Sequence, residues 1–287
     1  MSRPPKPGRF ALRRARPLLS TVVAAALHGS AAIAAAPPAP LSLGACKPTF
    51  NDDFNDLSAS AWGPGTRWIA HTPWNGDFGD AQFSDPRPGF PFTIEHGVLR
   101  IEARKGPDGT WRSGLLSTTD AHGNGFAQTY GYFEMRAKLP PGEGVWPAFW
   151  LVTADLKADP RIEIDAIEYY GVMTDKYFVT THVWHNDKTL THSETQPVAV
   201  GGGALSQAFH TYGVLVDHDW IVYYLDRQEV LRQRTPPEHT RPMGVLINLA
   251  LGGGWPSGNA PSPSYFYVDY VRAYPIPATC AGTSRTP

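Results

Sequence analysis

The chain has 287 residues, a formal net charge of −1, and 28 glycines and 28 prolines. This length allows one sizeable core, since large β-sandwiches and barrels reach it as a single domain. The near-neutral charge argues against nucleic acid as the main partner, and the Gly and Pro content predicts many turns and few helices.

Residues 1–36 are predicted to be a signal peptide. Lys and Arg are frequent in the first 16 residues, and a weakly apolar stretch then ends in three alanines at 34–36. A membrane anchor is the alternative, but His, Gly and Ser at 28–30 interrupt the stretch and make it a poor span. We therefore expect a secreted or periplasmic protein without membrane contact beyond export. The Arg13-Arg14 pair leaves twin-arginine export open.

A Pro-rich lead-in at 37–49 precedes the expected catalytic domain at 50–280, and residues 281–287 form a short tail. Cys46 and Cys280 are the only cysteines and lie at the two ends of the mature chain. In an exported protein this pair predicts one disulfide that ties the ends together. "LGAC" at 43–46 also resembles a lipoprotein box, but Cys46 lies well past the apolar stretch and Cys280 would lose its partner.

From Phe50 onward the sequence consists of short alternating runs separated by turn residues, which predicts an all-β domain. "FTIEHGVLRIEAR" predicts two strands joined at His96-Gly97, and "YGYFEMRAKL", "GVLINLAL" and "YFYVDYVRAY" predict further strands. No stretch has a helical period. This spacing of short strands indicates a sandwich or a barrel.

Two long loops are candidate rims of a binding cleft. Residues 71–92 are rich in aromatic and polar side chains, and residues 251–264 hold Trp255 among Gly and Pro. A surface Trp is costly without something to cover it, so Trp74 and Trp255 are expected to contact a ligand.

Three acids lie in the apolar stretch "RIEIDAIEYYG" at 161–171. Glu163 and Asp165 share a face of a regular strand, whereas Glu168, five residues after Glu163, would point the other way. A β-bulge at Ala166-Ile167 would return Glu168 to their face.

Three carboxylates on one face repel one another, and desolvation raises the pKa of at least one. Glycoside hydrolysis needs such a set, because it uses one carboxylate nucleophile and one carboxylic acid, ~5–5.5 Å apart in retaining enzymes. A solvated strand face is the plain alternative. A calcium site is a third reading, weakened by the lack of an Asx-rich loop.

The motif "EIDAIE" resembles the ExDxxE signature of glycoside hydrolase family 16, which includes laminarinases, lichenases, agarases and carrageenases. "SGLLST", "YGYFEMRAKLPPGEGVWPAFWL", "INLALGGGWP" and "VDYVRAY" are similar to further landmarks of that family in the same order. The resemblance covers roughly residues 50–275. "HTPWNGDFGDAQF" resembles a bacterial branch that includes exopolysaccharide-cleaving endoglycanases.

The resemblance implies a β-jelly-roll of two stacked antiparallel sheets with a concave substrate cleft. It implies Glu163 as nucleophile, Asp165 as assisting acid and Glu168 as general acid/base. The implied reaction is retaining endo-hydrolysis of a β-1,3 or mixed β-1,3-1,4 glucan or an exopolysaccharide, without a catalytic cofactor. A monomer with a polysaccharide as its partner is expected, and a structural calcium that includes Asp269 is left open.

Further side chains are expected in the cleft. Trp146 and Trp150, four apart, share a strand face, as do His182 and Trp184. Core packing is the alternative for Trp146 and Trp150, and a buried, hydrogen-bonded His is the alternative for His182, whereas the resemblance favours the cleft for Trp146, His182 and Trp184. The complete set of expected substrate-binding residues is Asn75, Arg112, Trp146, Trp150, His182, Trp184, Asn248 and Trp255.

Three other functions remain open on the sequence alone. They are hydrolysis of a galactan such as agarose or carrageenan, transglycosylation, and carbohydrate binding by a sandwich without catalysis. The presence of all three acids disfavours the last. The loop at 71–92 carries Asp77, Asp80 and Asp85 against only Arg87, which disfavours a sulfated substrate.

Overall fold

The structure, a computed structural model, describes residues 39–280, without the side chains of residues 279 and 280. The expected signal peptide at 1–36, the tail at 281–287 and the Cys280 side chain of the expected disulfide lie outside the described residues. Among residues 39–280, no helix is long and apolar enough to cross a membrane.

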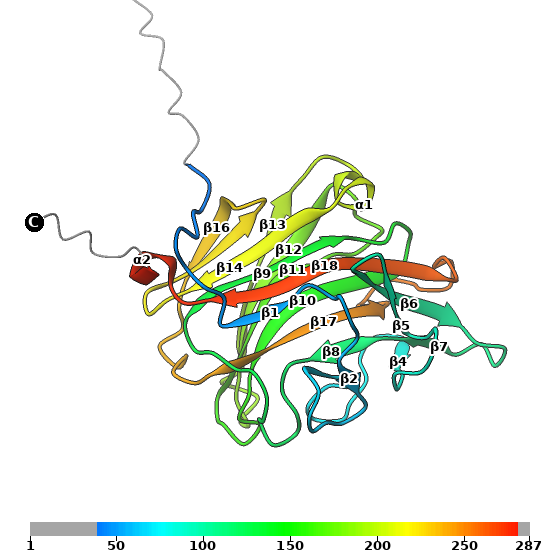
Figure 1. Cartoon of the computed structure of the whole chain (residues 1–287), viewed down its shortest axis with the longest axis horizontal. Coiled ribbons are helices and arrows are strands. Elements are labelled where there is room, and N and C mark those ends of the chain that lie inside the picture. The colour runs from blue at the N-terminus through cyan, green and yellow to red at the C-terminus, as the bar shows by residue number, and fades with distance from the viewer. Residues whose placement is uncertain (1–38, 281–287) are drawn as a thin grey trace, which may run out of the picture. The chain divides into compact units, whose positions relative to one another are not determined.

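The described domain is a sandwich of two β-sheets (Figure 1), which confirms the all-β prediction. One sheet has the order β16 (Gln228–Arg234), β15 (Trp220–Leu225), β14 (His210–Val216), β9 (Gly131–Lys138), β18 (Ser264–Tyr274), β6 (Val98–Lys105), β7 (Trp111–Ser113) and β4 (Ala81–Phe83), with β1 (Phe50–Asp52) on β18 and β5 (Phe92–Glu95) on β6. The other has the order β13 (His192–Ala199), β12 (Lys176–Trp184), β11 (Arg161–Glu168), β10 (Val145–Thr153), β17 (Met243–Leu251), β8 (Leu115–Ser117), β3 (Trp68–Ile69) and β2 (Ala59–Ser60). Two single-turn helices, α1 (Ala204–Gln207) and α2 (Pro277–Cys280), complete the described part.

The resemblance implied two antiparallel sheets, but each sheet also contains one short parallel pair. β2 pairs with β3 in parallel, and β4 pairs with β7 in parallel. Both pairs lie at sheet edges and are two or three residues long. β11, which carries the three acids, pairs antiparallel with β10 and β12, and β10 pairs antiparallel with β17.

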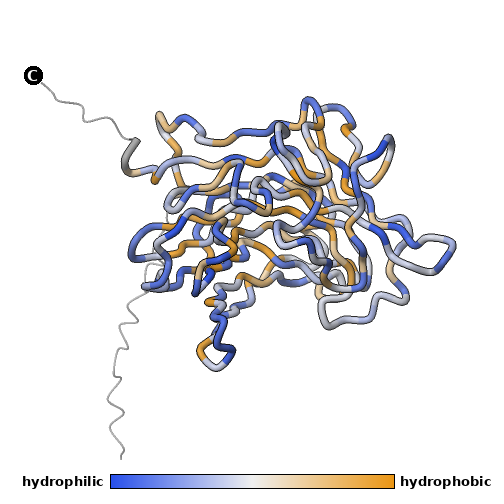
Figure 2. The backbone as a smooth tube through the Cα atoms, turned by 90° about the horizontal axis from the view of Figure 1, so that it is seen from below, coloured by the Kyte–Doolittle hydropathy of each residue, from blue (hydrophilic) through white to orange (hydrophobic). Residues whose placement is uncertain are grey.

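The main core lies between the sheets, where apolar side chains from both inner faces meet. In Figure 2, hydrophobic and hydrophilic residues alternate along many of the strands. β17 departs from simple alternation because all nine of its residues are buried. Val245, Ile247 and Leu249 face the main core. Leu246 and Ala250 belong to a second apolar cluster on the opposite face of the same sheet. That second cluster forms the floor of the candidate site.

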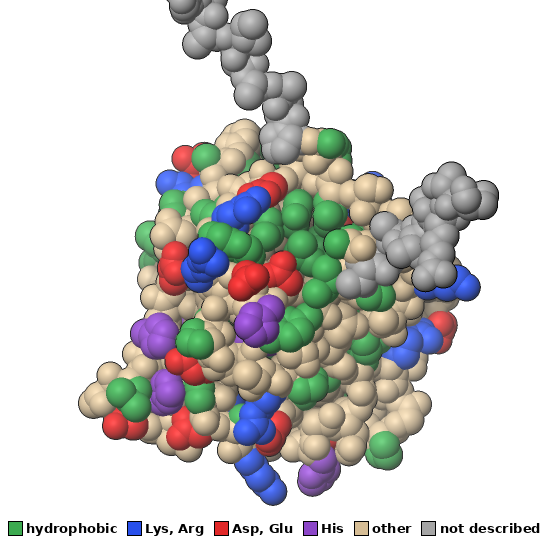
Figure 3. Space-filling model, turned by 90° about the vertical axis from the view of Figure 1, so that its left-hand side faces the viewer, with side chains coloured by type: hydrophobic (Ala, Val, Ile, Leu, Met, Phe, Trp, Pro, Cys, Tyr) green, Lys and Arg blue, Asp and Glu red, His purple; other side chains and the backbone are tan. Residues whose placement is uncertain are grey.

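The outer surface mixes charges of both signs. In the view of Figure 3, acidic, basic and histidine side chains alternate with hydrophobic ones.

Candidate active site

A β-bulge in β11 brings the three acids together. On β12, Asp165 lies opposite Thr180 and Glu168 lies opposite Phe178, so three steps along β11 match two along β12. The pairing with β10 is also shifted within this segment. The bulge predicted at Ala166-Ile167 is therefore confirmed. It turns Glu168 to the face of Glu163 and Asp165, since one extra residue reverses the alternation of side chains.

The acids line an elongated cleft on the concave face of the sheet β13-β12-β11-β10-β17-β8-β3-β2. One section, of about 370 Å³, holds all three acids and extends toward the loop at 71–92. A second section, of about 460 Å³, shares Glu163 and Glu168 with the first and extends toward Trp255. The acids thus lie in the middle of the cleft. The lining of the first section is Trp74, Phe78, Trp146, Ala148, Trp150, Glu163, Asp165, Glu168, Trp184 and Asn248.

Glu163 is held by two side chains of β12. Trp184 Nε1 donates a hydrogen bond of 2.9 Å to Glu163 Oε2, and His182 Nε2 lies 3.9 Å from Glu163 Oε1. The pKa of Glu163 is raised to about 8, chiefly by burial and next by the neighbouring Asp165 carboxyl, against the effects of His182 and Trp184. The position of Glu163 in the cleft therefore opposes its ionised form.

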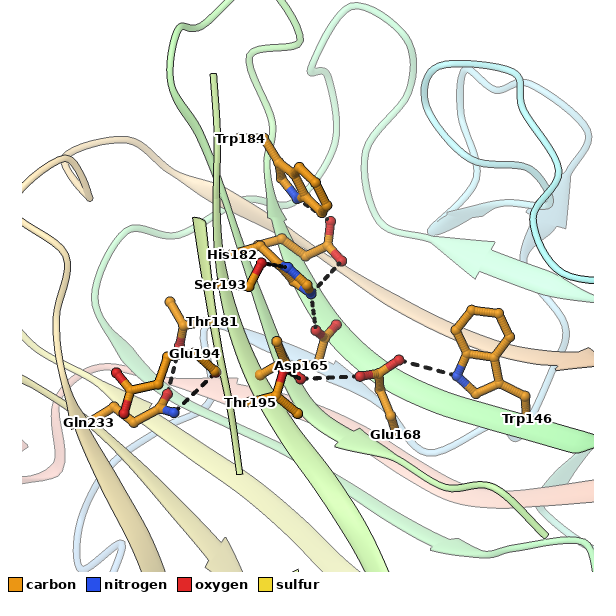
Figure 4. Close-up of polar contacts among 12 residues, drawn as sticks. Trp146, Asp165, Glu168, Thr181, His182, Trp184, Ser193, Glu194, Thr195 and Gln233 are labelled. Atoms are coloured by element: carbon orange, nitrogen blue, oxygen red, sulfur yellow. Dashed lines mark hydrogen bonds and ion pairs between the residues drawn. The ribbon is translucent and has the colours of Figure 1, made fainter. Parts of the chain in front are cut away.

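Asp165 is the most deeply buried of the three carboxyl groups. Its side chain is 5% exposed, and its Oδ2 lies 3.2 Å from His182 Nε2. Burial, and then the charge of Glu168, hold the pKa of Asp165 well above its ordinary value. The His182 ring stacks on Trp184 at 4.7 Å, and its Nδ1 lies 2.5 Å from Ser193 Oγ (Figure 4). These contacts fix the ring between Glu163 and Asp165.

Three donors orient Glu168. Trp146 Nε1 and the Tyr170 hydroxyl each donate to Glu168 Oε1 at 3.2 Å, and the Thr180 hydroxyl donates to Oε2 at 3.2 Å. Figure 4 shows Trp146 on one side of this carboxyl group and the β12–β13 side chains on the other. Glu168 therefore has a fixed direction in the cleft, on the opposite side of Asp165 from Trp184.

Most of the residues predicted to bind substrate lie in this cleft. Trp146, Trp150, Trp184 and Asn248 line the first section, and His182 and Trp255 line the second. The buried Asn248 is explained by Trp150, whose Nε1 donates a 2.8 Å hydrogen bond to Asn248 Oδ1.

Two predicted substrate-binding residues are not brought to the acids. Asn75 is exposed in a turn with φ of 55°, and it is absent from the linings of both cleft sections. Arg112 makes a two-pronged ion pair with Asp108, at 3.0 and 2.7 Å, and lines a separate basic cavity of about 500 Å³. Substrate contact by Asn75 and Arg112 stays a prediction, since neither a loop conformation nor a partner such as Asp108 follows from strand alternation.

The candidate calcium ligand Asp269 has a basic partner in the structure. Its Oδ2 accepts a hydrogen bond from Arg136 Nη1 at 2.5 Å. Among residues 39–280, the group of three or more His, Cys, Asp and Glu side chains spaced to hold a metal ion is Glu163, Asp165 and His182. A structural calcium at Asp269 stays a prediction, because backbone carbonyl ligands are common at such sites.

The sequence reasoning overlooked several side chains in the cleft. Tyr170 and Thr180 hold Glu168, Ser193 holds His182, and Phe78 packs edge-on against Trp146 at 5.4 Å. Tyr170 and Thr180 had a usable signal, since each lies two residues from a predicted site residue and so shares its face. Ser193 and Phe78 come from an edge strand and a loop, for which the sequence has no comparable signal.

A β-sandwich with an open cleft, crossed by aromatic side chains and centred on opposed carboxyl groups, is the arrangement of a glycoside hydrolase of the jelly-roll class. Residues 92–272 match the family described as Glycosyl hydrolases family 16, and the chain belongs to this family.

Individual relatives agree with this assignment. The chain is 34% identical, over 253 residues, to "Endo-1,3-1,4-beta-glycanase ExsH" of Rhizobium meliloti (strain 1021). The aligned region covers 80% of this chain and 52% of that protein. It is 29% identical, over 199 residues, to a "Beta-glucanase" of Rhodothermus marinus, covering 62% of this chain and 68% of that one. The chain thus spans about half the length of the first relative.

The fold is also that of solved structures. The catalytic domain of an endo-1,3-beta-glucanase (laminarinase) from Thermotoga petrophila RKU-1 superimposes with a TM-score of 0.64 at 24% identity. The superposition covers 80% of this chain and 98% of that domain. This likeness confirms the jelly-roll prediction.

Proposed function

We propose that this protein is an endo-acting β-glycanase that hydrolyses a β-1,3 or mixed β-1,3-1,4 glucan, or a related exopolysaccharide, with retention of configuration. The observation that carries the proposal is the bulge in β11, which presents three acids in the middle of a cleft. Since cleft sections extend to both sides of the acids, a polysaccharide can pass through and be cut internally. The two relatives, a 1,3-1,4-β-glycanase and a β-glucanase by name, favour a glucan over a galactan.

The carboxyl groups differ in how well they tolerate charge. Asp165 is almost fully buried, and its Oδ2 lies 3.2 Å from His182 Nε2 but accepts no hydrogen bond. Glu163 accepts the Trp184 hydrogen bond and lies near His182. Burial raises the pKa of both carboxyl groups, so the pair holds a proton at neutral pH, and Glu163 acts as the nucleophile in the form in which that proton rests on Asp165.

The proposed reaction has two steps. Glu163 attacks the anomeric carbon while the glycosidic bond breaks, and protonated Glu168 gives its proton to the leaving oxygen. Glu168, now a carboxylate, then takes a proton from water, whose oxygen bonds to the anomeric carbon and releases Glu163. The three donors around Glu168 keep its carboxyl group directed for both transfers. Transglycosylation would differ only in the acceptor of the second step.

The test is a product profile of the purified chain on laminarin, lichenan, carboxymethyl-cellulose, agarose and succinoglycan. We expect a series of oligosaccharides from one β-glucan or from succinoglycan, with no products from Glu163→Gln. Glu229→Gln, on β16 of the other sheet, is the matched acid-to-amide control and should retain activity. Binding without cleavage of any of the polymers would contradict the proposal. Products from agarose alone would show that the substrate is a galactan.

We further propose that the protein is exported, acts as a monomer and needs no cofactor for catalysis. Export rests on the basic and apolar pattern of residues 1–36. Cell fractionation with detection of the processed N-terminus tests this, and a cytoplasmic full-length chain would contradict it.

A further inference from the structure

A row of paired residues leads across the concave sheet from the acids to its far edge. Asp165 lies opposite Trp150 on β10, Trp150 opposite Leu246 on β17, and Leu246 opposite Ser117 on β8. Ser117 in turn lies opposite Ile69 on β3. Directly opposed residues share one face of a sheet, so all five lie on the face of the cleft. With strands about 4.8 Å apart, Ile69 is about 19 Å from Asp165 along this row.

An exposed tryptophan lies at the end of this row. Ile69 contacts the position of Gly63, since a Cβ there would be 3.5 Å from Ile69 Cγ2, and Trp62 precedes Gly63. The Trp62 ring stacks on the ring of His71, with centroids 4.2 Å apart and planes 9° from parallel. His71 Nε2 lies 2.7 Å from Asp85 Oδ1. Trp62 is nevertheless 43% exposed, among the most exposed large apolar side chains of the described residues.

The same loop connects this tryptophan to the acids. Trp74 is three positions after His71, which limits the distance between their Cα atoms to about 11 Å. Trp74 packs on Trp150 with ring centroids 6.0 Å apart and lines the cleft section that holds the acids. Trp150, Trp74 and Trp62 therefore follow one another outward from the acids along one side of the sheet.

Hydrogen bonds fix the loop that carries Trp62. The Gly63 amide donates to Ser60 Oγ at 2.9 Å, and Ser60 Oγ lies 3.0 Å from Thr66 Oγ1. The Thr66 hydroxyl donates to the Trp68 carbonyl at 2.7 Å. A side chain held in this way loses little entropy when a ligand covers it.

We propose that Trp62, backed by His71 and Asp85, is an outer sugar-binding subsite at the β2–β3 end of the cleft. Its open face is suited to stack on the apolar face of a neutral pyranose ring, several sugar units from the bond that is cut. This proposal rests on the proposed function, because it places the distant part of the same polysaccharide chain. It implies that long chains are bound better than short ones.

The test compares Trp62→Ala, Trp62→Phe and the control Trp220→Ala, a half-buried tryptophan on β15 of the other sheet. On the long polymer cleaved by the wild type, Trp62→Ala should lower kcat/KM roughly three- to tenfold, mainly through KM. On oligosaccharides too short to reach from the acids to Trp62, it should match the wild type. Trp62→Phe should keep most of the polymer activity, and Trp220→Ala should show no difference between long and short substrates.

Two results would overturn the subsite. One is unchanged KM of Trp62→Ala on the polymer, and the other is an equal loss on long and short substrates. Binding is also measured without cleavage, so that failure of the subsite can be told from failure of the proposed hydrolysis. The double variant Trp62→Ala/Glu163→Gln is compared with Glu163→Gln for retardation in gels that contain each polymer. Weaker retardation than Glu163→Gln alone supports the subsite even if the wild type cuts nothing, and equal retardation refutes it.

Discussion

Replacing Glu163 with Gln should stabilise the folded protein at neutral pH while it abolishes activity. The wild-type carboxyl group has a pKa raised from 4.5 to about 8, chiefly by burial. The folded state therefore holds a proton that the unfolded state releases between these pH values. Since the folded state binds more protons, the free energy of unfolding falls as pH rises through this window. Gln carries no charge and avoids this loss.

The size of the effect follows from the two pKa values. The rise from 4.5 to about 8 corresponds to about 5 kcal/mol at full ionisation, at about 1.4 kcal/mol per pH unit. The Glu163 side chain is 21% exposed and titrates together with Asp165, which reduces this figure. At pH 7 we expect Glu163→Gln to raise the free energy of unfolding by about 2–3 kcal/mol, or Tm by roughly 5–10 °C.

The assay is urea and thermal unfolding of the wild type and Glu163→Gln at pH 4, 5, 6, 7 and 8. The stability difference should be close to zero at pH 4, where both side chains are neutral, and should grow with pH. Glu229→Gln, which loses an exposed pair with Arg232, should show no such growth. A difference that is independent of pH, or a Glu163→Gln protein less stable than the wild type at pH 7, would refute the reasoning.

Two further predictions concern the neighbours of Glu163. Glu168→Gln should lower kcat on polymers roughly 10²–10⁴-fold, because an amide cannot protonate the leaving oxygen. A substrate whose leaving group is acidic needs no such proton, so the variant should recover much of its activity on it. Equal losses on both substrates would contradict the role of Glu168 as the acid. Asn248→Ala should lower the free energy of unfolding by about 1–3 kcal/mol in urea titrations, since Trp150 Nε1 loses its buried acceptor. Asn248→Asp keeps an acceptor oxygen but adds a buried charge, so a stability equal to that of the wild type would show that the site is wetter than the structure indicates.

The bulge was predictable because it follows from chemistry and spacing together. Glu163 and Glu168 are an odd number of residues apart, so they share a face only if one residue is inserted between them. Carboxyl groups that must act together make this insertion necessary. Alternation along regular strands showed that Trp146 shares a face with Trp150, and His182 with Trp184. Their place in the cleft was an expectation from the resemblance to the family.

The remaining features depend on pairing that a single sequence does not reveal. β17 is buried on both faces because the loop at 71–92 covers its cleft side, and only the fold shows that Asn248 meets Trp150. Arg112 lies on β7, and its ion pair with Asp108, four residues earlier, could not be read from the sequence. The stack of Trp62 on His71 joins two loop residues whose conformations have no periodic signal.

The central claim is that Glu163 and Glu168 cleave a β-linked polysaccharide through a covalent intermediate. Proton NMR during the first minutes of digestion of the preferred polymer tests it most directly, since it identifies the anomer formed at the new reducing end before mutarotation. We predict that the β-anomer appears first and that the α-anomer follows only as the sugar equilibrates. Initial release of the α-anomer would show inversion by a single displacement, and would contradict the nucleophilic role of Glu163.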